Sequence, residues 1–353
     1  MTTTVADIVS RFPELLSVAR GDGAVEVAGP ASAERARAGA IVFAGNETLF
    51  ARALEGPAAV IVASAALIDG APQEGPARTF LACDNAELAM ALVCRAFFPE
   101  TANRQPFDGQ RVHTSAAISA SAELAPDVVV GPHAVIGAHT RVGAGCVIGG
   151  NTHIEANASI GEGTHIHPHV FIAHGTVIGR RCEVHPMSSL GTEGYGYAHD
   201  AEFNHYRLVH YGRLIVEDDV HIGAGVFIDR GRFDDTVIGA GTKIDNYCHI
   251  AHNVRIGRNC LITGGFGAAG SVTIGEGNVF GGRVSITDHV TIGDRMMFAG
   301  LSAISKNVDE PGGKFGGYPL QPIADFLKTN ATIAQLPRMR KQIDQLMRKL
   351  GLK

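Results

Sequence analysis

Three positions at intervals of about 18 residues carry groups that could together transfer an acyl group. His252 lies in the run HIAHNVRIG, Gly270 follows 18 residues later, and a further 18 residues lead to Asp288, next to His289. A histidine, whose pKa is ordinarily about 6.5, can act as a general base at neutral pH. A glycine allows a substrate to approach its backbone N–H, and such a donor stabilises an oxyanion. We therefore predict that His252, Gly270 and His289 form a catalytic group.

A period of six residues must position these groups. Aliphatic residues occupy every sixth position from Val112 to Leu190, and the period returns after an interruption, shifts by four residues through 230–235 and continues to Ile304. An α-helix repeats near 3.6 residues and a strand near 2, so neither explains the pattern. A hexapeptide β-helix does, because six residues form one short strand and one turn, and three such units complete a triangular coil of about 18 residues.

The predicted fold class is therefore mainly β, with a parallel β-helix over residues 112–310. Known hexapeptide proteins imply that it is left-handed. Coils stack at about 4.8 Å, so the three catalytic candidates should lie on one wall across three coils, with the outer pair about 10 Å apart. Asp245 and Asn246 come about one strand before His252 and should lie on the adjoining wall.

The small residues of the repeat have two expected roles. Glycine often follows the aliphatic position, and we expect it to relieve turns that need unusual backbone angles. The fourth residue after each aliphatic position is small or β-branched and should point inward. Four of the six cysteines, at 146, 182, 248 and 260, occupy this inward site. We therefore assign them to packing rather than to catalysis.

Most of the 16 histidines are expected to be exposed on the walls. The cluster His165, His167, His169 and His174 contains the residue type that binds zinc, and trimeric β-helix carbonic anhydrases hold zinc through histidines. The competing interpretation is a ladder in which His167 stacks on His185, one coil further along. We expect the ladder, and therefore no metal.

The flanks of the β-helix lack the period. Residues 1–100 are predicted to form a small α/β domain, with helix-like stretches at 7–16 and 85–98 and strand-like stretches at 40–45 and 58–64. Residues 101–111 are expected to be a linker. Residues 311–353 are predicted to form a loop and a helical tail of more than one helix, with a break near Pro337.

Composition argues against several classes of protein. The formal net charge is −5, so the chain shows no basic face for nucleic acid. The first residues lack the pattern of a signal peptide, and no stretch of about 18 apolar residues indicates a transmembrane segment. No two cysteines form a C-x-x-C pair. We therefore expect a cytoplasmic protein with reduced thiols.

The run from 212 to 257 resembles the UDP-3-O-acylglucosamine N-acyltransferases of lipid A synthesis. The matching motifs are, in order, IDRG (228–231), DDTVIG (234–239), IDN (244–246), IAHN (250–253), AGS (269–271) and GYPLQP (317–322). Weaker similarity extends through both flanks and covers essentially the whole chain. Motifs of this length in this order are highly specific.

The resemblance implies a role for each candidate residue. His252 corresponds to the general base, which takes a proton as the glucosamine 2-amine attacks an acyl thioester, and Gly270 corresponds to the oxyanion donor. His289 corresponds to the second active-site histidine, near the phosphates of the nucleotide sugar. Asp245 and Asn246 correspond to residues that hold the sugar. No cofactor or metal is implied.

The resemblance also implies that the N-terminal domain binds uracil through an aromatic–x–x–Asn–x–x–aromatic pattern. Phe43 and Asn46 match the first two positions in VFAGNETLF. Leu49 stands at the second aromatic position, and the neighbouring Phe50 is the candidate for the missing ring.

The implied reaction moves a 3-hydroxyacyl chain from acyl carrier protein to the 2-amine of UDP-3-O-(3-hydroxyacyl)-glucosamine. Residues 321–353 contain seven lysines and arginines against two aspartates, which suits an acidic partner such as this carrier. Equally, this tail is a solvated helix that packs against other copies of the chain. We expect a homotrimer with sites at subunit clefts, since a flat-sided prism buries its walls around a threefold axis.

Three alternatives remain open from the sequence. A related hexapeptide acyltransferase would use another thioester donor, such as acyl- or acetyl-CoA, or another nucleotide amino-sugar. A metal-dependent hydratase of the carbonic anhydrase type would contain bound metal. A non-catalytic β-helix scaffold would transfer no acyl group at all.

Overall fold

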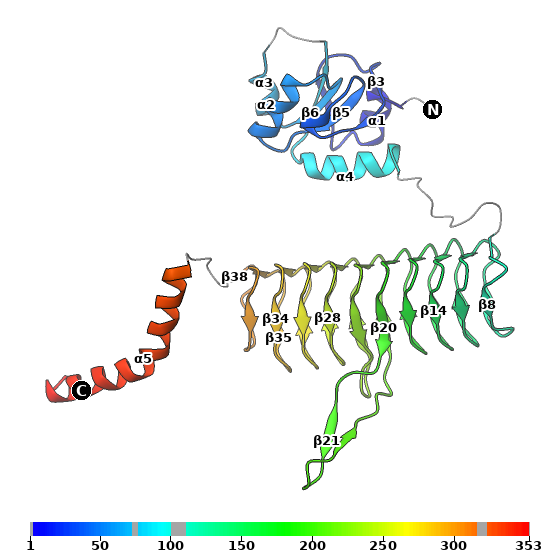
Figure 1. Cartoon of the computed structure of the whole chain (residues 1–353). Helices are drawn as coiled ribbons and strands as arrows, with labels where there is room; N and C mark the ends of the chain where they lie inside the picture. The colour runs from blue at the N-terminus through cyan, green and yellow to red at the C-terminus, as the bar shows by residue number, and fades with distance from the viewer. Residues whose placement is uncertain (1–2, 73–76, 100–110, 316–322, 353) are drawn as a thin grey trace. The chain divides into compact units, whose positions relative to one another are not determined.

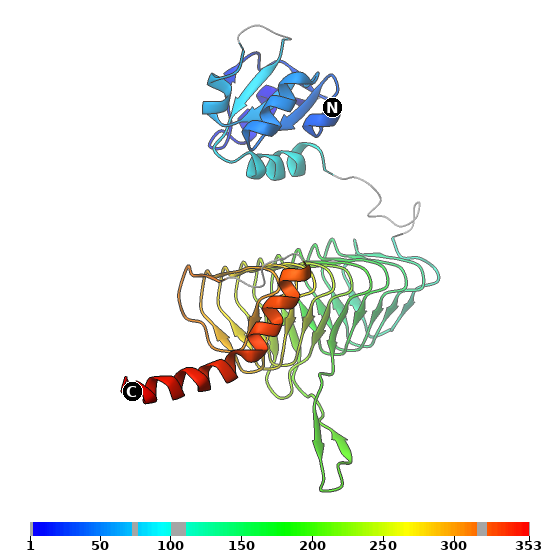
Figure 2. The ribbon, with the colours of Figure 1, turned by 60° about the vertical axis from the view of Figure 1, so that its left-hand side comes forward.

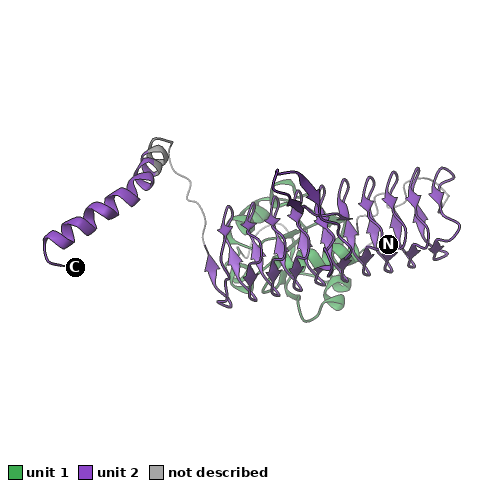
Figure 3. Ribbon diagram, turned by 90° about the horizontal axis from the view of Figure 1, so that it is seen from below, with its two compact units in different colours: residues 1–103 green, residues 104–353 purple. Residues whose placement is uncertain are grey.

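A computed structural model describes residues 3–72, 77–99, 111–315 and 323–352 of the chain. The chain divides into two compact units, residues 1–103 and 104–353, which we describe separately (Figure 3). The expected linker, 101–111, lies almost entirely outside the described residues, and so does the GYPLQP motif at 317–322.

Unit 1 is an α/β domain built on one mixed sheet. The strand order is β2 (Ser17–Arg20), β7 (Thr79–Ala82), β6 (Val60–Ala63), β5 (Ala40–Phe43) and β4 (Gly29–Pro30). The last four of these strands run parallel, and β2 is antiparallel to β7. A short ribbon of β1 (Thr3–Thr4) and β3 (Glu26–Val27) and a 3-10 turn at Ala33–Arg35 lie outside this sheet.

Helices cover both faces of the sheet (Figure 1). One apolar cluster includes α1 (Val5–Arg11) and α4 (Ala86–Phe97), and the other includes α2 (Glu47–Glu55) and α3 (Ala65–Asp69). The side chains of Asn46 and Asn85 start α2 and α4, because each accepts the N–H of the residue three positions later. The first helix ends at Arg11 instead of continuing to 16, since Pro13 disfavours helical backbone at Phe12.

The β-helix of unit 2 has three walls, each a parallel sheet of short strands (Figure 2). The first wall consists of β10 (Val129–Val130), β13 (Val147–Ile148), β16 (His165–Ile166), β19 (Glu183–Val184), β24 (His221–Ile222), β27 (Lys243–Ile244), β30 (Leu261–Ile262), β33 (Val279–Phe280), β36 (Met297–Phe298) and β38 (Lys314–Phe315). The second wall consists of β8 (Ala117–Ile118), β11 (Val135–Ile136), β14 (His153–Ile154), β17 (Phe171–Ile172), β20 (Ser189–Thr192), β25 (Phe227–Asp229), β28 (His249–Ile250), β31 (Gly267–Ala268), β34 (Ser285–Ile286) and β37 (Ala303–Ile304). The third wall consists of β9 (Glu123–Leu124), β12 (Arg141–Val142), β15 (Ser159–Ile160), β18 (Val177–Ile178), β23 (Leu214–Val216), β26 (Thr236–Ile238), β29 (Arg255–Ile256), β32 (Thr273–Ile274) and β35 (Thr291–Ile292).

The register between coils follows the period of the sequence. Through most of each wall a residue pairs with the residue 18 positions later, as Ile148 does with Ile166. The interval is 38 where residues 193–213 are inserted, so that Ile178 pairs with Val216. It is 22 across the insert at 230–235. The coil continues past the expected end at 310 to Phe315, whose ring stacks on Phe298 with centroids 5.1 Å apart.

Inward side chains fill the interior of the coil as predicted. The aliphatic positions from Val130 to Leu190, Ile148 and Ile166 among them, are buried, whereas Val112 is exposed and Ile118 and Leu124 are half-buried in the first coil. At the small inward site, Thr152 donates its hydroxyl hydrogen to the carbonyl of His167 at 2.9 Å, so a buried polar atom keeps a partner. The four cysteines at this site are buried too, and burial raises the pKa of Cys182 to about 11.

The predicted reason for the recurring glycine is wrong. Gly131, Gly137 and Gly149 do not have positive φ, but a Cβ on any of them would lie 2.4–2.6 Å from the backbone of the next coil. Positive φ occurs two residues later in the turn, for example at Asn151 (57°). Glycine is therefore required for close contact between coils, and asparagine, which tolerates left-handed backbone, often occupies the positive-φ position.

Two further segments complete unit 2. Residues 193–213 (the excursion) carry a hairpin of β21 (Tyr197–His199) and β22 (His205–Arg207) that points away from the walls (Figure 1). The helix α5 (Ile323–Lys349) continues through Pro337, so the predicted break into separate helices is wrong. The helix bends along its length instead (Figure 1), which is the usual response to proline. None of the helices in the described part of the chain is both long and apolar enough to cross a membrane.

Candidate active site

The catalytic candidates lie at one corner of the β-helix, between its second and third walls, and not on one wall as predicted, because each follows the end of a short strand. The turns after β28, β31 and β34 form this corner (the His252 corner). The Ser271 N–H donates to the carbonyl of His252 at 3.0 Å, and the His289 N–H donates to the carbonyl of Gly270 at 3.1 Å. The structure therefore brings His252, Gly270 and His289 together on consecutive coils.

The imidazole of His252 lies against Gly270. A Cβ on Gly270 would be 2.7 Å from Cε1 and 2.8 Å from Nε2 of His252, so any larger residue would displace the ring. Among the described residues, the Gly270 N–H donates no backbone hydrogen bond. That N–H is therefore available, close to the imidazole, for a substrate oxygen.

Asn253 determines which nitrogen of His252 can accept a proton. The side-chain oxygen of Asn253 accepts the Arg232 N–H at 3.0 Å, and its amide nitrogen donates to the carbonyl of Asp234 at 3.2 Å. Because that oxygen is an acceptor, Nδ1 of His252, 3.1 Å away, must be the donor. Nε2 then keeps its lone pair, which is what a general base requires.

The His252 corner opens on a pocket of about 540 Å³. The insert contributes residues 232–235 to the lining, and the corner contributes His252, Asn253, Arg255, Ser271 and His289. The Arg213 guanidinium binds Asp235 at 2.9 Å and holds the pKa of that carboxyl below its usual value. Eight of the nine lining residues are polar or charged, so the pocket offers several groups that could bind a polar ligand.

The chain is similar to known proteins. The bacterial transferase hexapeptide (six repeats) family matches residues 139–174, 157–192 and 235–265. The chain is 41% identical to the UDP-3-O-acylglucosamine N-acyltransferase of Methylorubrum extorquens over 160 residues, 45% of each protein, so this match spans less than half of that relative. It is 37% identical to the protein of the same name from Methylococcus capsulatus over 98% of this chain and 97% of the relative. The chain belongs to this family.

The chain is also similar to solved structures. LpxA from Acinetobacter baumannii is 25% identical to this chain, with 60% of this chain and 72% of that one covered and a TM-score of 0.46.

The two residues predicted to hold the sugar lie at a different corner. Asp245 and Asn246 are exposed in the turn between the first and second walls and do not line the pocket at His252. The Asp245 carboxylate accepts the N–H groups of Asn246 at 2.7 Å and Gly264 at 2.9 Å. The Asn246 side chain accepts the Ala224 N–H at 2.7 Å. A single copy of the chain therefore does not bring these two residues to the base.

The uracil-binding residues expected of an N-acyltransferase lie in unit 1. Phe43 ends β5 and is half-buried, and Asn46 caps α2 through the Leu49 N–H. Phe50 is only 5% exposed and packs on Phe80, with ring centroids 6.3 Å apart. The proposed replacement ring is therefore in the core of the domain and cannot stack on a base.

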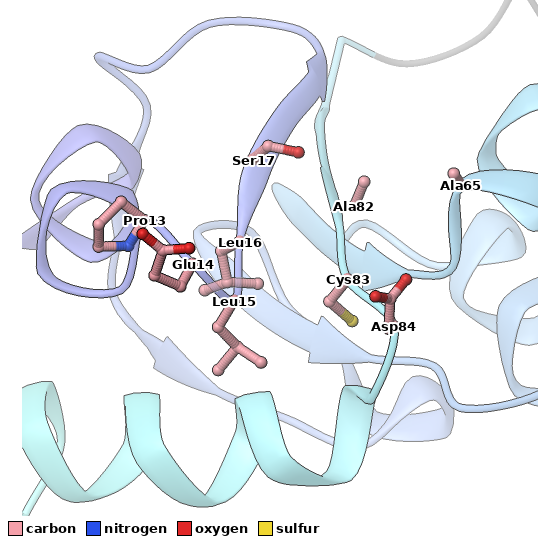
Figure 4. A pocket seen from close by; sticks show the side chains of 9 residues that line it. All are labelled: Pro13, Glu14, Leu15, Leu16, Ser17, Ala65, Ala82, Cys83 and Asp84. Atoms are coloured by element: carbon pink, nitrogen blue, oxygen red, sulfur yellow. The ribbon is translucent and has the colours of Figure 1, made fainter.

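A separate hollow of about 190 Å³ lies elsewhere in unit 1 (Figure 4). Its lining residues are Pro13, Glu14, Leu15, Leu16, Ser17, Ala65, Ala82, Cys83 and Asp84. Phe43 and Asn46 are not among them, so this hollow is not the one that the family pattern predicts.

The histidine cluster on the walls is only partly the one predicted. The residues that lie close enough together to hold a metal ion are His165, His167 and Glu183. His169 and His174 are outside this group. The ladder is also present, because the ring of His167 stacks on His185 with centroids 4.5 Å apart. Nε2 of His167 lies 3.0 Å from the Glu183 carboxylate.

Sequence reasoning missed two residues that orient the base, Asn253 and Arg232. Asn253 directly follows His252 in the IAHN motif, so its position was a usable signal. Arg232 lies in the insert, where the six-residue period is broken and register cannot be counted.

Proposed function

We propose that the chain is an N-acyltransferase of lipid A biosynthesis, which moves a 3-hydroxyacyl group from acyl carrier protein to the 2-amine of UDP-3-O-(3-hydroxyacyl)-glucosamine. One observation carries the proposal. The imidazole of His252 is oriented by Asn253 and lies against Gly270, beside a pocket of about 540 Å³. Aminolysis of a thioester needs a base for the amine and a donor for the oxyanion, and both are close together here.

The proposed steps use only groups of the chain, without a cofactor. The amine nitrogen attacks the thioester carbonyl carbon, a C–N bond forms, and the proton of the amine passes to Nε2 of His252. The Gly270 N–H stabilises the oxyanion, and one such donor typically contributes about 3–4 kcal/mol. The C–S bond then breaks, and the imidazolium returns the proton to the departing thiolate. The products are the carrier thiol and a UDP-diacylglucosamine.

The deciding experiment measures product formation by mass spectrometry for wild type and His252→Ala. We expect kcat to fall at least about 100-fold, because the amine loses its base. His205→Ala is the matched control, since His205 lies on the exposed hairpin of the excursion, and it should retain wild-type turnover. Near-wild-type turnover of His252→Ala would overturn the proposal.

The same assay decides between donors. Exposed basic residues of α5, including Arg338, Arg340 and Lys341, support acyl carrier protein, because an acidic carrier would be steered towards them. Equal concentrations of 3-hydroxyacyl carrier protein and 3-hydroxyacyl-CoA should give faster turnover with the carrier. Faster turnover with CoA would identify a related hexapeptide acyltransferase with another donor.

The assembly proposed is a homotrimer in the cytoplasm. Exposed apolar side chains on α5 alternate at intervals of three and four residues, at Leu336, Met339, Ile343 and Leu346, and Leu350 follows just after the helix ends. This is the spacing of a coiled-coil seam, which three copies would bury together. We propose that in this trimer Asp245 and Asn246 of one copy approach the His252 corner of the next, with the sites at subunit clefts. The six free cysteines fit a reducing compartment.

A further inference from the structure

The excursion places a second histidine against the base. His210 is only 3% exposed, and its ring lies edge-to-face on His252, with centroids 5.1 Å apart. Neither ring nitrogen of His210 has a hydrogen-bond partner among the described residues. His210 does not line the pocket, so it is placed to contact the base and not the substrate.

A glycine of the excursion makes this contact possible. A Cβ on Gly194 would lie 2.9 Å from both Cβ and Cδ2 of His252 and 3.0 Å from Nε2 of His210. The opposite edge of the same imidazole faces Gly270. The His252 ring is therefore confined between two glycines, Gly194 and Gly270.

Backbone hydrogen bonds hold the segment around His210 in place. The Leu208 N–H donates to the carbonyl of Gly196 at 2.9 Å, and the Tyr211 N–H donates to the carbonyl of Arg232 at 2.7 Å. Arg232 in turn donates its N–H to Asn253, the partner of the base. The excursion and the insert thus form one framework around the His252 imidazole.

We propose that His210, with Gly194, is a positioning residue, which presses the His252 imidazole against Gly270 so that Nε2 stays aimed at the pocket. This inference rests on the proposed function, in which His252 is the base. Burial and the neighbouring His252 and Arg232 lower the pKa of His210. A neutral ring in this place supports the base without opposing the imidazolium that forms during transfer.

The test compares His210→Ala, His210→Phe and Gly194→Ala in the full chain, with His205→Ala as the control. His210→Ala should lower kcat about 10- to 100-fold and leave KM within about twofold, because the ring of the base loses its support but the pocket does not change. His210→Phe keeps a neutral ring and should recover at least about half of wild-type kcat. Gly194→Ala should resemble His210→Ala, because its methyl group separates the two rings.

A second measurement does not depend on turnover. Diethyl pyrocarbonate modifies unprotonated imidazoles, and peptide mass spectrometry reports the rate at His252 alone. We expect the rate to rise at least about threefold in His210→Ala and Gly194→Ala and to stay at the wild-type value in His210→Phe and His205→Ala. An unchanged modification rate of His252 in both His210→Ala and Gly194→Ala would overturn the inference, even if the acyl substrate proves to be a different one. Equal loss of kcat in His210→Phe and His210→Ala, at unchanged melting temperature, would also overturn it.

Discussion

At the residue scale, the candidate site depends on two glycines as well as on the His252 imidazole. Gly270 and Gly194 leave room on two edges of the His252 ring, and Asn253 binds the third. The ring therefore has one orientation, in which its free nitrogen lies beside an unpaired backbone N–H. Preorganisation of this kind lowers the barrier because nothing has to reorient during the reaction.

Substitution of Gly270 tests this steric requirement. Gly270→Ala should lower kcat at least about 100-fold, because the added methyl group would lie 2.7 Å from Cε1 of His252 and must displace the ring. Gly267→Ala is the matched control, since a Cβ there has no atom within 4 Å. Steady-state kinetics and melting temperature of both variants check the prediction. Equal activity of the two variants would contradict it.

A buried carboxyl next to this corner makes stability depend on pH. Asp229 is 7% exposed, and burial raises its pKa from 3.8 to about 7, with Nε2 of His249 3.9 Å away. Because the pKa is higher in the folded state, the carboxyl contributes its full stability below about pH 4, and this contribution is lost as pH rises to about 7.

Asp229→Asn should remove this dependence, since an amide of the same shape does not ionise. Between pH 4 and 7 the free energy of unfolding of wild type should fall relative to the variant by at most about 4 kcal/mol. Denaturant titrations at a series of pH values measure the difference. The exposed Glu162→Gln provides the control, and curves for wild type and Asp229→Asn that run parallel would refute the expectation.

At the scale of elements, the walls position the site and the inserted segments complete it. The regular coils supply His252, Gly270 and His289, whereas the insert at 230–235 and the excursion supply the groups that surround the base. Both inserted segments lengthen the sequence interval between paired residues, to 38 and 22 residues, but the strands on either side of each insertion still pair. Each strand of a wall pairs with its neighbour over only two or three residues. The walls therefore tolerate insertions between one short strand and the next.

The helix α5 makes its own prediction. Leu346→Asp places a carboxylate in the apolar seam, so the concentration at which the proposed trimer dissociates should rise at least about tenfold. Gln345→Asp adds the same charge on the other side of the helix and should have no effect. Sedimentation of the full chain measures both. If the two variants dissociate alike, the seam does not join the copies.

At the scale of the whole molecule, the residues proposed to bind the sugar and those proposed to catalyse the reaction lie apart within one chain. Asp245 and Asn246 lie at one corner of the coil and His252 at the next, so the proposed trimer would bring them together from different copies. A threefold arrangement brings unlike corners of neighbouring copies together at each cleft.

Co-assembly of two inactive variants tests this arrangement. Asp245→Ala and His252→Ala should each be nearly inactive as pure trimers. Expressed together in equal amounts, they should recover about a quarter of wild-type activity, because a quarter of the clefts combine an intact His252 with an intact Asp245 of the neighbour. Assays of purified mixed trimers measure the recovery. No recovery in trimers shown to contain both variants would place both residues in a site of one chain.

The sequence alone predicts the coil, because an aliphatic residue at every sixth position fixes the register between successive coils. Counting by 18 then places Gly270 over His252, and it places the cysteines in the core. These inferences succeed because they need only the regular geometry of strands and turns. The expectation that Asp245 lies on a neighbouring wall is wrong, because this residue follows the end of β27 in the turn between the first and second walls.

Only the tertiary structure shows how the inserted segments, which lie outside the six-residue period, pack against the coil. Counting cannot place His210 or Arg232, which lie where the period is interrupted, and it cannot show that Phe50 turns into the core. It also assigned the recurring glycines to unusual backbone angles, although they serve close contact between coils. A periodic pattern specifies which way a side chain points within a regular coil, whereas distances between inserted segments follow from three-dimensional packing that has no period to read.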